Sequence, residues 1–430
     1  MQRVLVVTVG GSPHPVINAC REFQPDFTYF VCSKGRLPHG SEDTVDGPGD
    51  PCGDKRTQKC PECSADVPLG NPKGKAIVYQ VNISPHAYAK KVVEDPDDLE
   101  EVYGVMLSIH HEVKQRFPNA TKAISYTGGT KNMTVGAVLL GLHYPEWQLA
   151  INKGPRRDLI KVTQGDSWWP INISSIYAKG QLQAYIPLLE RYEYNTVQEL
   201  LRPLQMNPSL PNQERARLYR LRQFCTAFDA WDRFDHQEAL SRLEALGGRA
   251  GPWIRLAKNL VGVLPKGNPY QAVADLVLNA ARRVKQGGYD DAVARLYRAV
   301  EMLAQVRLKE MYEVNTGKVD LGKVPAECRS LCEAAVQDDG EIRLPLVRSY
   351  ELLACLKDEL GRLWREQESR VKNALRVRNF SILAHGNEVI RETHYRECGT
   401  VFENFIKQGL EVCQVKPEWH QLPTAELLEM

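Results

Sequence analysis

The sequence predicts an α/β domain with a mostly parallel sheet, followed by a domain built of helices. Three observations support this expectation. The chain has 430 residues, more than one hydrophobic core usually supports, so we expect at least two domains. From Arg3 to about Thr163, short β-branched and aromatic runs alternate with helix-like stretches. After Tyr177 the strand pattern fades, and helical periodicity continues almost to the end.

Six short apolar runs are the expected strands, because unbroken runs of this length between helices are typical of a parallel sheet covered on both faces. They lie at residues 4–9, 27–32, 76–83, 123–127, 147–151 and 159–162. Between the second and third runs, residues 33–75 form a long segment rich in Gly, Pro, Asp and Lys. A loop of this length is usually a functional lid or partly mobile.

The helical half is interrupted by proline and asparagine at 207–211 and again at 265–269. Between Tyr270 and Tyr312, apolar spacings of three and four predict two amphipathic helices joined near Gly287-Gly288. A further helix is expected over roughly 347–384, with Gly386 as its C-terminal cap. We therefore divide the chain into an α/β domain at 1–180, a helical connector at 181–268 and a C-terminal helical domain at 269–430.

The composition is that of an ordinary globular protein, with 43% hydrophobic and 25% charged residues. The net charge is +2, from 55 basic and 53 acidic residues, so contact with nucleic acid would depend on a local patch. No apolar run approaches the ~20 residues of a membrane helix, and the N-terminus turns polar too soon for a signal peptide. We therefore expect a cytoplasmic protein without membrane contact.

The cysteines, eleven in number, mostly lie singly in apolar segments, which predicts reduced, buried thiols. Examples are Cys20, Cys225, Cys355 and Cys413. The exception is a cluster of Cys52, Cys60 and Cys63, in which the last two have zinc-knuckle spacing. A fourth ligand would have to be His39 or Cys32. A complete site needs two close pairs and one is present, so free thiols are favoured over structural zinc.

Two glycine-rich turns directly follow expected strands. The first, Thr8-Val9-Gly10-Gly11-Ser12-Pro13, allows close backbone approach, and Ser12 could cap a helix that begins at Pro13. The second covers 126–132 and opens a helix expected to continue through Leu142; its N–H groups, hydroxyls and ammonium suit phosphate oxygens. Loops at the carboxyl ends of neighbouring strands share one crevice at the switch point of such a sheet. The expected ligand site comprises Thr8, Gly10, Gly11, Ser12, Thr127, Gly128, Gly129, Thr130, Lys131 and Asn132.

A third candidate site lies near the C-terminus. Arg378 and His385 are seven residues apart, which places them within about 20° on one face of the expected helix. The opposite face is expected to pack through Leu375, Phe380, Ile382 and Leu383. A guanidinium clamps phosphate, an imidazole carries protons near neutral pH, and Asn379 could orient either group. This chemistry suffices for RNA cleavage without a metal, although ordinary surface Arg/His pairs share the spacing.

These motifs resemble those of the CRISPR-associated CARF–HEPN ribonucleases of type III systems. The turns 8–12 and 127–131 are similar to the two ligand loops of the family's Rossmann-like CARF domain. Arg378-Asn379, with His385 after six intervening residues, is similar to the HEPN motif. The resemblance covers nearly the whole chain in order, whereas the long loop at 33–75 and the helical stretch at about 185–264 are not required by the family pattern.

The resemblance implies a homodimer that binds one cyclic oligoadenylate across its two-fold axis and joins two Arg378/Asn379/His385 sets into a catalytic site for single-stranded RNA. Even ring sizes suit a two-fold axis, so four or six adenylates are admissible, and we favour four. No cofactor is required for catalysis. A further expectation is that the ligand crevice slowly cleaves its own ring, with a hydroxyl of Thr8, Ser12 or Thr130 positioning the attacking 2′-OH.

Two other functions stay open. The chain could be a non-catalytic cyclic-oligonucleotide sensor that acts through protein partners, with its helical half as an interaction module. It could also be a nucleotide-metabolising enzyme that uses the 127–132 loop. Neither NAD nor ATP is well supported, because the turns lack the G-x-G-x-x-G and Gly-Lys-Ser/Thr patterns.

Overall fold

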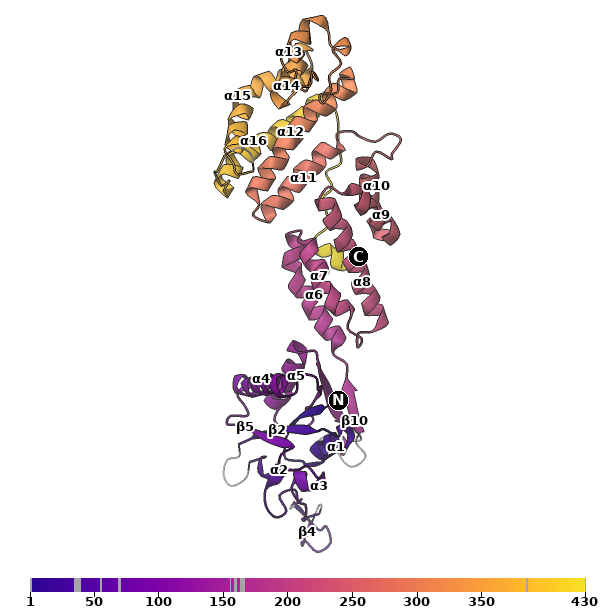
Figure 1. The fold of residues 1–430 in the computed structure, drawn as a ribbon. Coiled ribbons are helices and arrows are strands. Elements are labelled where there is room, and N and C mark those ends of the chain that lie inside the picture. The colour runs from indigo at the N-terminus through magenta and orange to yellow at the C-terminus, as the bar shows by residue number, and fades with distance from the viewer. Residues whose placement is uncertain are drawn as a thin grey trace. The chain divides into compact units, whose positions relative to one another are not determined.

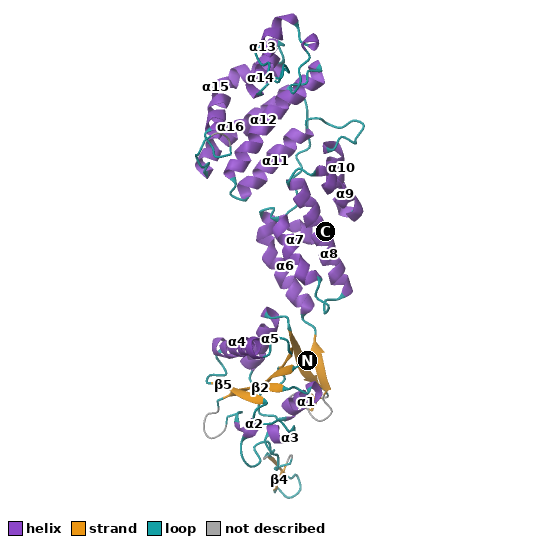
Figure 2. Cartoon of the chain, viewed as in Figure 1, coloured by secondary structure: helices purple, strands orange, loops and turns teal. Residues whose placement is uncertain are grey.

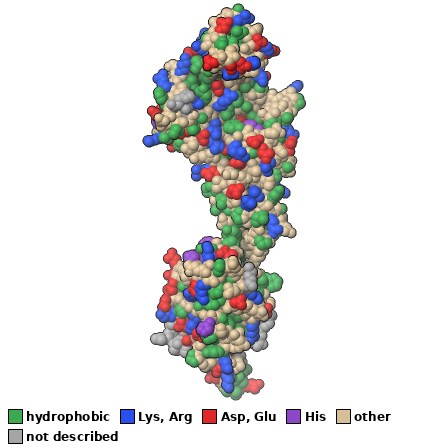
Figure 3. Space-filling model, viewed as in Figure 1, with side chains coloured by type: hydrophobic (Ala, Val, Ile, Leu, Met, Phe, Trp, Pro, Cys, Tyr) green, Lys and Arg blue, Asp and Glu red, His purple; other side chains and the backbone are tan. Residues whose placement is uncertain are grey.

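The computed structural model describes residues 2–34, 40–54, 56–68, 71–154, 156–157, 161–162, 167–383 and 386–429. The chain divides into two compact units, Met1–Gly180 and Gln181–Met430. Figures 1 and 2 show strands in the first and helices in the second. The visible face in Figure 3 carries basic and acidic side chains intermixed, in keeping with the small net charge. No helix in the described part is long and apolar enough to cross a membrane.

The first unit is built on a six-stranded sheet in the order β10-β7-β6-β1-β2-β5. Five strands run parallel, and β10 runs antiparallel to β7 at one edge. The strands are β1 (Arg3–Thr8), β2 (Phe27–Ser33), β5 (Tyr88–Val93), β6 (Thr121–Ser125), β7 (Trp147–Lys153) and β10 (Ser167–Ile171). The chain builds outward from β1 to β2 and β5, then crosses to place β6 on the other side of β1. The expected mostly parallel sheet is confirmed, with its switch point between β1 and β6.

Helices cover both faces of this sheet (Figure 1). Successive side chains of a strand point to opposite faces. Val4 and Val6 of β1 therefore belong to the core shared with α4 (Leu99–Arg116) and α5 (Lys131–His143). Leu5 and Val7 belong to the opposite core, shared with α1 (His14–Phe23). This double burial explains why β1 reads as an unbroken apolar run.

Two expected strands are wrong. Residues 76–83 contain a short helix, α3 (Ile77–Gln80), and the strand that pairs with β2 is β5. The sequence pattern of a short apolar run does not distinguish a strand from a buried helical turn. The edge strand β5 was missed because Lys90 and Lys91 interrupt its apolar pattern. Within 159–162, residues 161–162 form β9 (Lys161–Val162), which pairs with β8 (Arg156–Arg157) outside the main sheet, and 159–160 lie outside the described residues. The missed edge strand β10 contains Pro170, which argued against a strand.

The long 33–75 segment holds three short elements among its described residues. These are α2 (Asp43–Asp46) and a ribbon of β3 (Thr57–Lys59) with β4 (Asp66–Pro68). The predicted loop is therefore partly structured.

Helices come next, and the first of them begins within the first unit. They are α6 (Ser174–Glu190), α7 (Tyr194–Gln205), α8 (Asn212–Asp232), α9 (His236–Leu246) and α10 (Gly251–Leu260), with the 3₁₀ turn η1 (Gly248–Ala250). The expected breaks at 207–211 and 265–269 fall between helices, as predicted.

A C-terminal bundle follows, with α11 and α12 joined at Gly287-Gly288 as expected. Its helices are α11 (Gln271–Lys285), α12 (Tyr289–Tyr312), α13 (Arg329–Glu333), α14 (Leu346–Cys355), α15 (Glu359–Asn379) and α16 (Glu392–Val412), with 3₁₀ turns η2 (Leu321–Lys323), η3 (Ala326–Cys328) and η4 (Ala425–Glu429). The tail after α16 returns to the earlier helices, where Tyr194 Oη donates to Pro423 O at 2.5 Å and Gln271 Nε2 to Glu418 O at 2.8 Å. The bundle and the connector are therefore tied together.

The single helix expected at 347–384 is wrong, because the structure has α14 and α15 there. The chain turns at Lys357, whose φ is +58°, and Asp358 Oδ1 caps α15 by accepting from Leu360 N at 2.8 Å. The second helix ends at Asn379, so Gly386 is not its cap. The Gly386 N–H instead donates to Ser381 O at 3.2 Å, in a turn where a side chain at 386 would collide with Phe380 O.

One cysteine prediction is also wrong. Cys355 forms a disulfide with Cys328, because η3 and α13 pack against α14 and bring the two residues together. Cys20, Cys225 and Cys413 are buried free thiols, as expected.

Candidate functional sites

The two glycine-rich turns meet backbone to backbone where the parallel neighbours β1 and β6 end. A Cβ on Gly10 would lie 2.5 Å from Gly129 N, and one on Gly128 would lie 2.6 Å from Thr8 O. Because real Cβ atoms do not approach so closely, both positions require glycine. Gly129 also has a φ of +86°, which favours glycine. The turns therefore lie together, as their places on the sheet predict.

The first two threonine hydroxyls of the predicted site hold these turns in shape. Thr8 is buried, and its Oγ1 donates to Gly128 O at 2.6 Å. Thr127 Oγ1 accepts from Asn152 N at 2.7 Å, which ties the second turn to β7. Both hydroxyls therefore form bonds within the protein, Thr8 as a donor and Thr127 as an acceptor.

The second turn is fastened in the same way where α5 begins. Thr130 Oγ1 accepts from Met133 N at 3.3 Å as the helix cap and donates to Pro96 O at 2.8 Å. The Asn132 amide donates to Asp97 O. Lys131, the first residue of α5, is exposed. Ser12 does not cap α1, because that helix begins at His14 with Pro13 in the cap position.

A cavity of about 320 Å³ opens at this sheet edge, within the size range of small-ligand sites. Four of the predicted residues line it: Gly10, Gly11, Gly129 and Thr130. Its other wall was missed from the sequence and consists of Val9, Ser33, Gly40, Ser41 and Thr44. Ser33 ends β2, the other neighbour of β1, so its place beside the crevice follows from sheet order alone.

The missed wall is fixed to the end of β2. Ser33 N donates to Ser41 Oγ at 2.8 Å, and the two hydroxyl oxygens lie 3.1 Å apart. Thr44 Oγ1 donates to Ser41 O at 2.6 Å. The start of the long 33–75 segment therefore forms a wall of the cavity, and its hydroxyls and the glycine backbones give it a polar lining suited to phosphate or ribose oxygens.

Within the part of the chain that the structure describes, the three cysteines proposed as zinc ligands are not gathered into a metal site. Cys52 Sγ donates to Thr44 O at 3.3 Å, and burial raises the pKa of its thiol to about 11. In the ribbon, backbone N–H groups of Cys63 and Glu62 lower the pKa of Cys60. Among the described residues, no three His, Cys, Asp or Glu side chains lie close enough to share a metal ion. The candidate fourth ligand His39 lies outside the described residues, and Cys32 is buried.

Arg378 lies in the last turn of α15, where its guanidinium packs over an aromatic ring of α12. The guanidinium carbon lies 4.2 Å from the ring centroid of Tyr297. Arg378 Nη1 also donates to Asn379 Oδ1 at 3.2 Å, so the two predicted residues are in contact. Burial raises the pKa of the Tyr297 hydroxyl, which leaves a neutral ring beneath the cation.

His385 lies outside the described residues. The expectation that one helix carries both Arg378 and His385 is wrong, because α15 ends at Asn379. Its apolar partner face is also partly wrong: Leu375 is buried, but Phe380, Ile382 and Leu383 are more than half exposed. Val389, across the turn, is 61% exposed. An exposed apolar patch (Phe380, Ile382, Leu383 and Val389) therefore lies beside Arg378 in the sequence, where a packed face was expected.

Comparison with known proteins bears on both units. Residues 263–408 match the family described as the Csm6 HEPN domain. The fold of the whole chain is similar to that of Enterococcus italicus Csm6 bound to cyclic hexa-2′-fluoro-hexa-dAMP, with a TM-score of 0.63 and 14% sequence identity over 100% of this chain and 98% of that one. No curated protein matches the sequence. Residues 263–408 are thus similar to a HEPN domain, and the chain as a whole shares its fold with a Csm6 protein.

The resemblance to the CARF–HEPN proteins of type III CRISPR systems is thereby confirmed. The α/β unit has the Rossmann-like fold expected from that resemblance, and its glycine turns stand at the switch point of its sheet. The HEPN match begins shortly before α11 and includes α15, so Arg378, Asn379 and His385 all belong to the matched segment.

Proposed function

We propose that this protein is a cyclic-oligoadenylate-activated endoribonuclease that cuts single-stranded RNA in CRISPR antiviral defence. The observation that carries the proposal is the HEPN match over 263–408 together with the placement of Arg378 at the end of α15, over the ring of Tyr297. A HEPN domain with an available arginine beside an amide and a histidine in sequence supports nuclease chemistry more directly than a purely interacting role.

The chemistry assigned to the site is transesterification within the RNA. The ribose 2′-oxygen attacks the adjacent phosphorus, the bond to the 5′-oxygen breaks, and a 2′,3′-cyclic phosphate forms. The Arg378 guanidinium stabilises the charge that develops on the phosphorane, and Asn379 orients that guanidinium. His385 serves as the proton carrier between the 2′-hydroxyl and the leaving 5′-oxygen. These steps use side chains of the chain itself and require no metal.

The site is proposed to form between two copies of the chain. Phe380, Ile382, Leu383 and Val389 are each more than half exposed in the single chain, although they flank the proposed nuclease residues. Exposed apolar groups gathered at a functional segment are typical of an interface. A two-fold axis through this patch would bring two Arg378 residues to one RNA strand.

The activator is proposed to bind at the switch point of the CARF sheet. The cavity there presents the backbones of Gly10, Gly11 and Gly129 with the hydroxyl residues Ser33 and Ser41. Enterococcus italicus Csm6 is bound to a cyclic hexanucleotide analogue, so six adenylates now join four as the first ring sizes to test.

The nuclease assignment is tested by cleavage of a fluorogenic single-stranded RNA in the presence of activator and EDTA. Arg378→Ala and His385→Ala should each lower the rate at least 100-fold while leaving activator binding unchanged. Arg376→Ala removes an exposed arginine from the same last turn of α15 and should keep the wild-type rate within about threefold. Wild-type cleavage by Arg378→Ala would contradict the assignment.

A further inference from the structure

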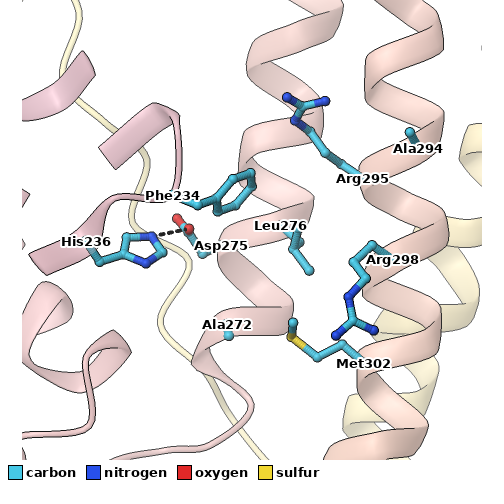
Figure 4. A pocket seen from close by; sticks show the side chains of 9 residues that line it. All are labelled: Phe234, His236, Ala272, Asp275, Leu276, Ala294, Arg295, Arg298 and Met302. Atoms are coloured by element: carbon cyan, nitrogen blue, oxygen red, sulfur yellow. Dashed lines mark hydrogen bonds and ion pairs between the residues drawn. The ribbon is translucent and has the colours of Figure 1, made fainter. Parts of the chain in front are cut away.

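A second cavity, of about 460 Å³, lies in the helical unit between the start of α9 and the helices α11 and α12 (Figure 4). Its walls combine three kinds of side chain. Leu276 and Met302 are apolar, Phe234 and His236 are aromatic, and Arg295 and Arg298 are cationic. The proposed ribonuclease chemistry uses none of these residues, and the volume is within the range of small-molecule sites, roughly 300–1,000 Å³.

His236 is held in one orientation by a buried carboxylate, as the dashed line in Figure 4 shows. Its Nε2 lies 3.0 Å from Asp275 Oδ2, and Asp275 Oδ1 accepts from Trp231 Nε1 at 2.9 Å. Asp275 is 4% exposed, so its charge requires both donors. When Nε2 carries the proton, Nδ1 is an acceptor. Within the described residues no donor bonds Nδ1, so it is free to accept from a ligand.

The two arginines are oriented by acidic and amide neighbours through their Nη1 side. Arg298 Nη1 donates to Glu301 Oε2 at 2.7 Å and to Gln305 Oε1 at 2.8 Å. Arg295 Nη1 donates to Asp291 Oδ1 at 2.8 Å, and its Nε to Asn279. None of these bonds uses Nη2. Each guanidinium is therefore preorganised with a donor edge left for an anion.

A third cavity, of about 630 Å³, lies next to the second and shares Phe234 and Arg295 with it. It adds three further arginines, Arg191, Arg233 and Arg283. Carboxylates of Glu193, Asp229 and Asp232 pair with these arginines, so this hollow is polar but not strongly charged. Together the two cavities form an apolar, aromatic compartment beside an arginine-lined one.

We propose that these adjoining cavities bind a nucleoside phosphate, with the base in the smaller compartment and the phosphates at the arginines. The Phe234 ring offers a face for stacking, and Leu276 and Met302 supply the apolar wall. The His236 Nδ1 acceptor selects bases with an exocyclic amine, such as adenine, over uracil. Arg295 and Arg298 bind the phosphate through their Nη2 edges. A free nucleotide and the terminal nucleotide of an RNA share this chemistry, and the test separates them.

The test is calorimetric titration of the full-length protein with AMP, ATP, UMP, inorganic pyrophosphate and a 5′-phosphorylated, 2′-O-methylated trinucleotide. We expect AMP or ATP, or the trinucleotide, to bind, and Phe234→Ala and Arg298→Ala each to weaken that binding at least tenfold. Tighter binding of AMP than of the trinucleotide identifies a free nucleotide as the source, and the reverse order identifies an RNA end. His236→Ala should remove the preference for AMP over UMP.

The matched control is Arg348→Ala. Arg348 pairs with Glu351 at 2.7 Å with the same i,i+3 spacing and similar exposure as Arg298 with Glu301, but it does not line the cavities. Binding to this variant should stay within about twofold of wild type. Arg298→Lys, which keeps the charge, separates loss of binding from loss of folding. The proposal is overturned if no nucleotide or trinucleotide binds in a way that Phe234→Ala or Arg298→Ala weakens, or if pyrophosphate binds as tightly as ATP.

Discussion

Arg378 is steadied by an aromatic ring rather than by a carboxylate. Its guanidinium packs on Tyr297 and contacts the neutral amide of Asn379, and no acid pairs with it among the described residues. A carboxylate in that place would compete with an RNA phosphate for the same donors, whereas a ring leaves them free. Lysine lacks the planar fork of donors, so Arg378→Lys should not restore the activity that Arg378→Ala removes.

Gly10 and Gly11, in the first glycine-rich turn of the α/β unit, differ in how closely other atoms surround them. A Cβ on Gly10 would lie 2.5 Å from Gly129 N, whereas a Cβ on Gly11 has nothing within 4 Å. Gly10→Ala should therefore lower the free energy of unfolding by about 1–3 kcal/mol, and Gly11→Ala should change it by less than about 0.5 kcal/mol. Urea unfolding of both variants without ligand checks this. Equal stabilities would show that the turns can separate without cost.

The lowered pKa of Glu112 predicts how the stability of the α/β unit depends on pH. Burial opposes its charge, but bonds from Lys91, Arg116 and Tyr29, at 2.6–2.9 Å, lower its pKa to about 2. Because the pKa is lower in the folded state, this stabilisation is complete above the unfolded value near 4.5 and is lost as the pH falls towards 2. Its size is on the order of 3 kcal/mol.

Glu112→Gln should therefore be less stable than wild type at pH 7, with a constant difference down to about pH 5 that shrinks below pH 4.5. Urea unfolding at several pH values measures it. A difference that stays unchanged from pH 7 to pH 3 would rule out this account of the charge.

The role of the glycines in the two turns was easier to predict from the sequence than the role of the hydroxyl groups. Adjacent glycines at the end of a strand imply a close backbone approach wherever the partner lies. A threonine hydroxyl can bond a ligand, its own loop or both, and Thr8, Thr127 and Thr130 each bond neighbouring parts of the chain in the structure. Ser33 and Ser41 were missed because they carry no motif, and their position depends on the order of strands in the sheet.

Among the elements, the turn between α14 and α15 is fastened by a single buried acid. Asp358 is 4% exposed; its Oδ1 caps α15, and its Oδ2 accepts from Arg307 Nε and Tyr312 Oη, each at 2.9 Å. Asp358→Ala should cost about 3–5 kcal/mol of stability, because it strands Arg307 and removes the cap.

The control is Glu359→Ala. Glu359 directly follows Asp358, is exposed and pairs with Arg362, so its removal should cost less than about 1 kcal/mol of stability. Urea unfolding followed by circular dichroism compares the two. An Asp358→Ala variant as stable as Glu359→Ala would mean that the turn does not depend on this acid.

The turn between α14 and α15 also explains why the sequence led to a wrong helix prediction around Arg378 and His385. Leu356-Lys357-Asp358 contains neither proline nor glycine, so the apolar periodicity continues across these residues and predicts one helix through 384. The seven-residue spacing of Arg378 and His385 then suggested a shared helix face that the structure does not have. Helix existence followed from periodicity, but helix ends depend on tertiary bonds such as those of Asp358.

For the whole molecule, the order of domains was the most predictable feature. The parallel sheet follows from short apolar runs between helices, and the helical half follows from spacings of three and four. What the runs could not fix was the sheet's edges, since β5 and β10 carry lysine or proline where a buried strand would be apolar. The prediction of function depended on the glycine-rich turns together with the distant Arg378/His385 pair, and neither motif is specific alone.

We propose that a ligand at the switch point of the α/β sheet turns on RNA cleavage by Arg378, Asn379 and His385. The most direct measurement is the rate of single-stranded RNA cleavage by the wild-type protein with a panel of cyclic and linear oligoadenylates, in EDTA. We predict at least a 100-fold increase with one cyclic ring, of four or six adenylates, and no cleavage by Arg378→Ala under the same condition. A rate that no cyclic oligoadenylate changes, or activated cleavage that survives in Arg378→Ala, would contradict the account.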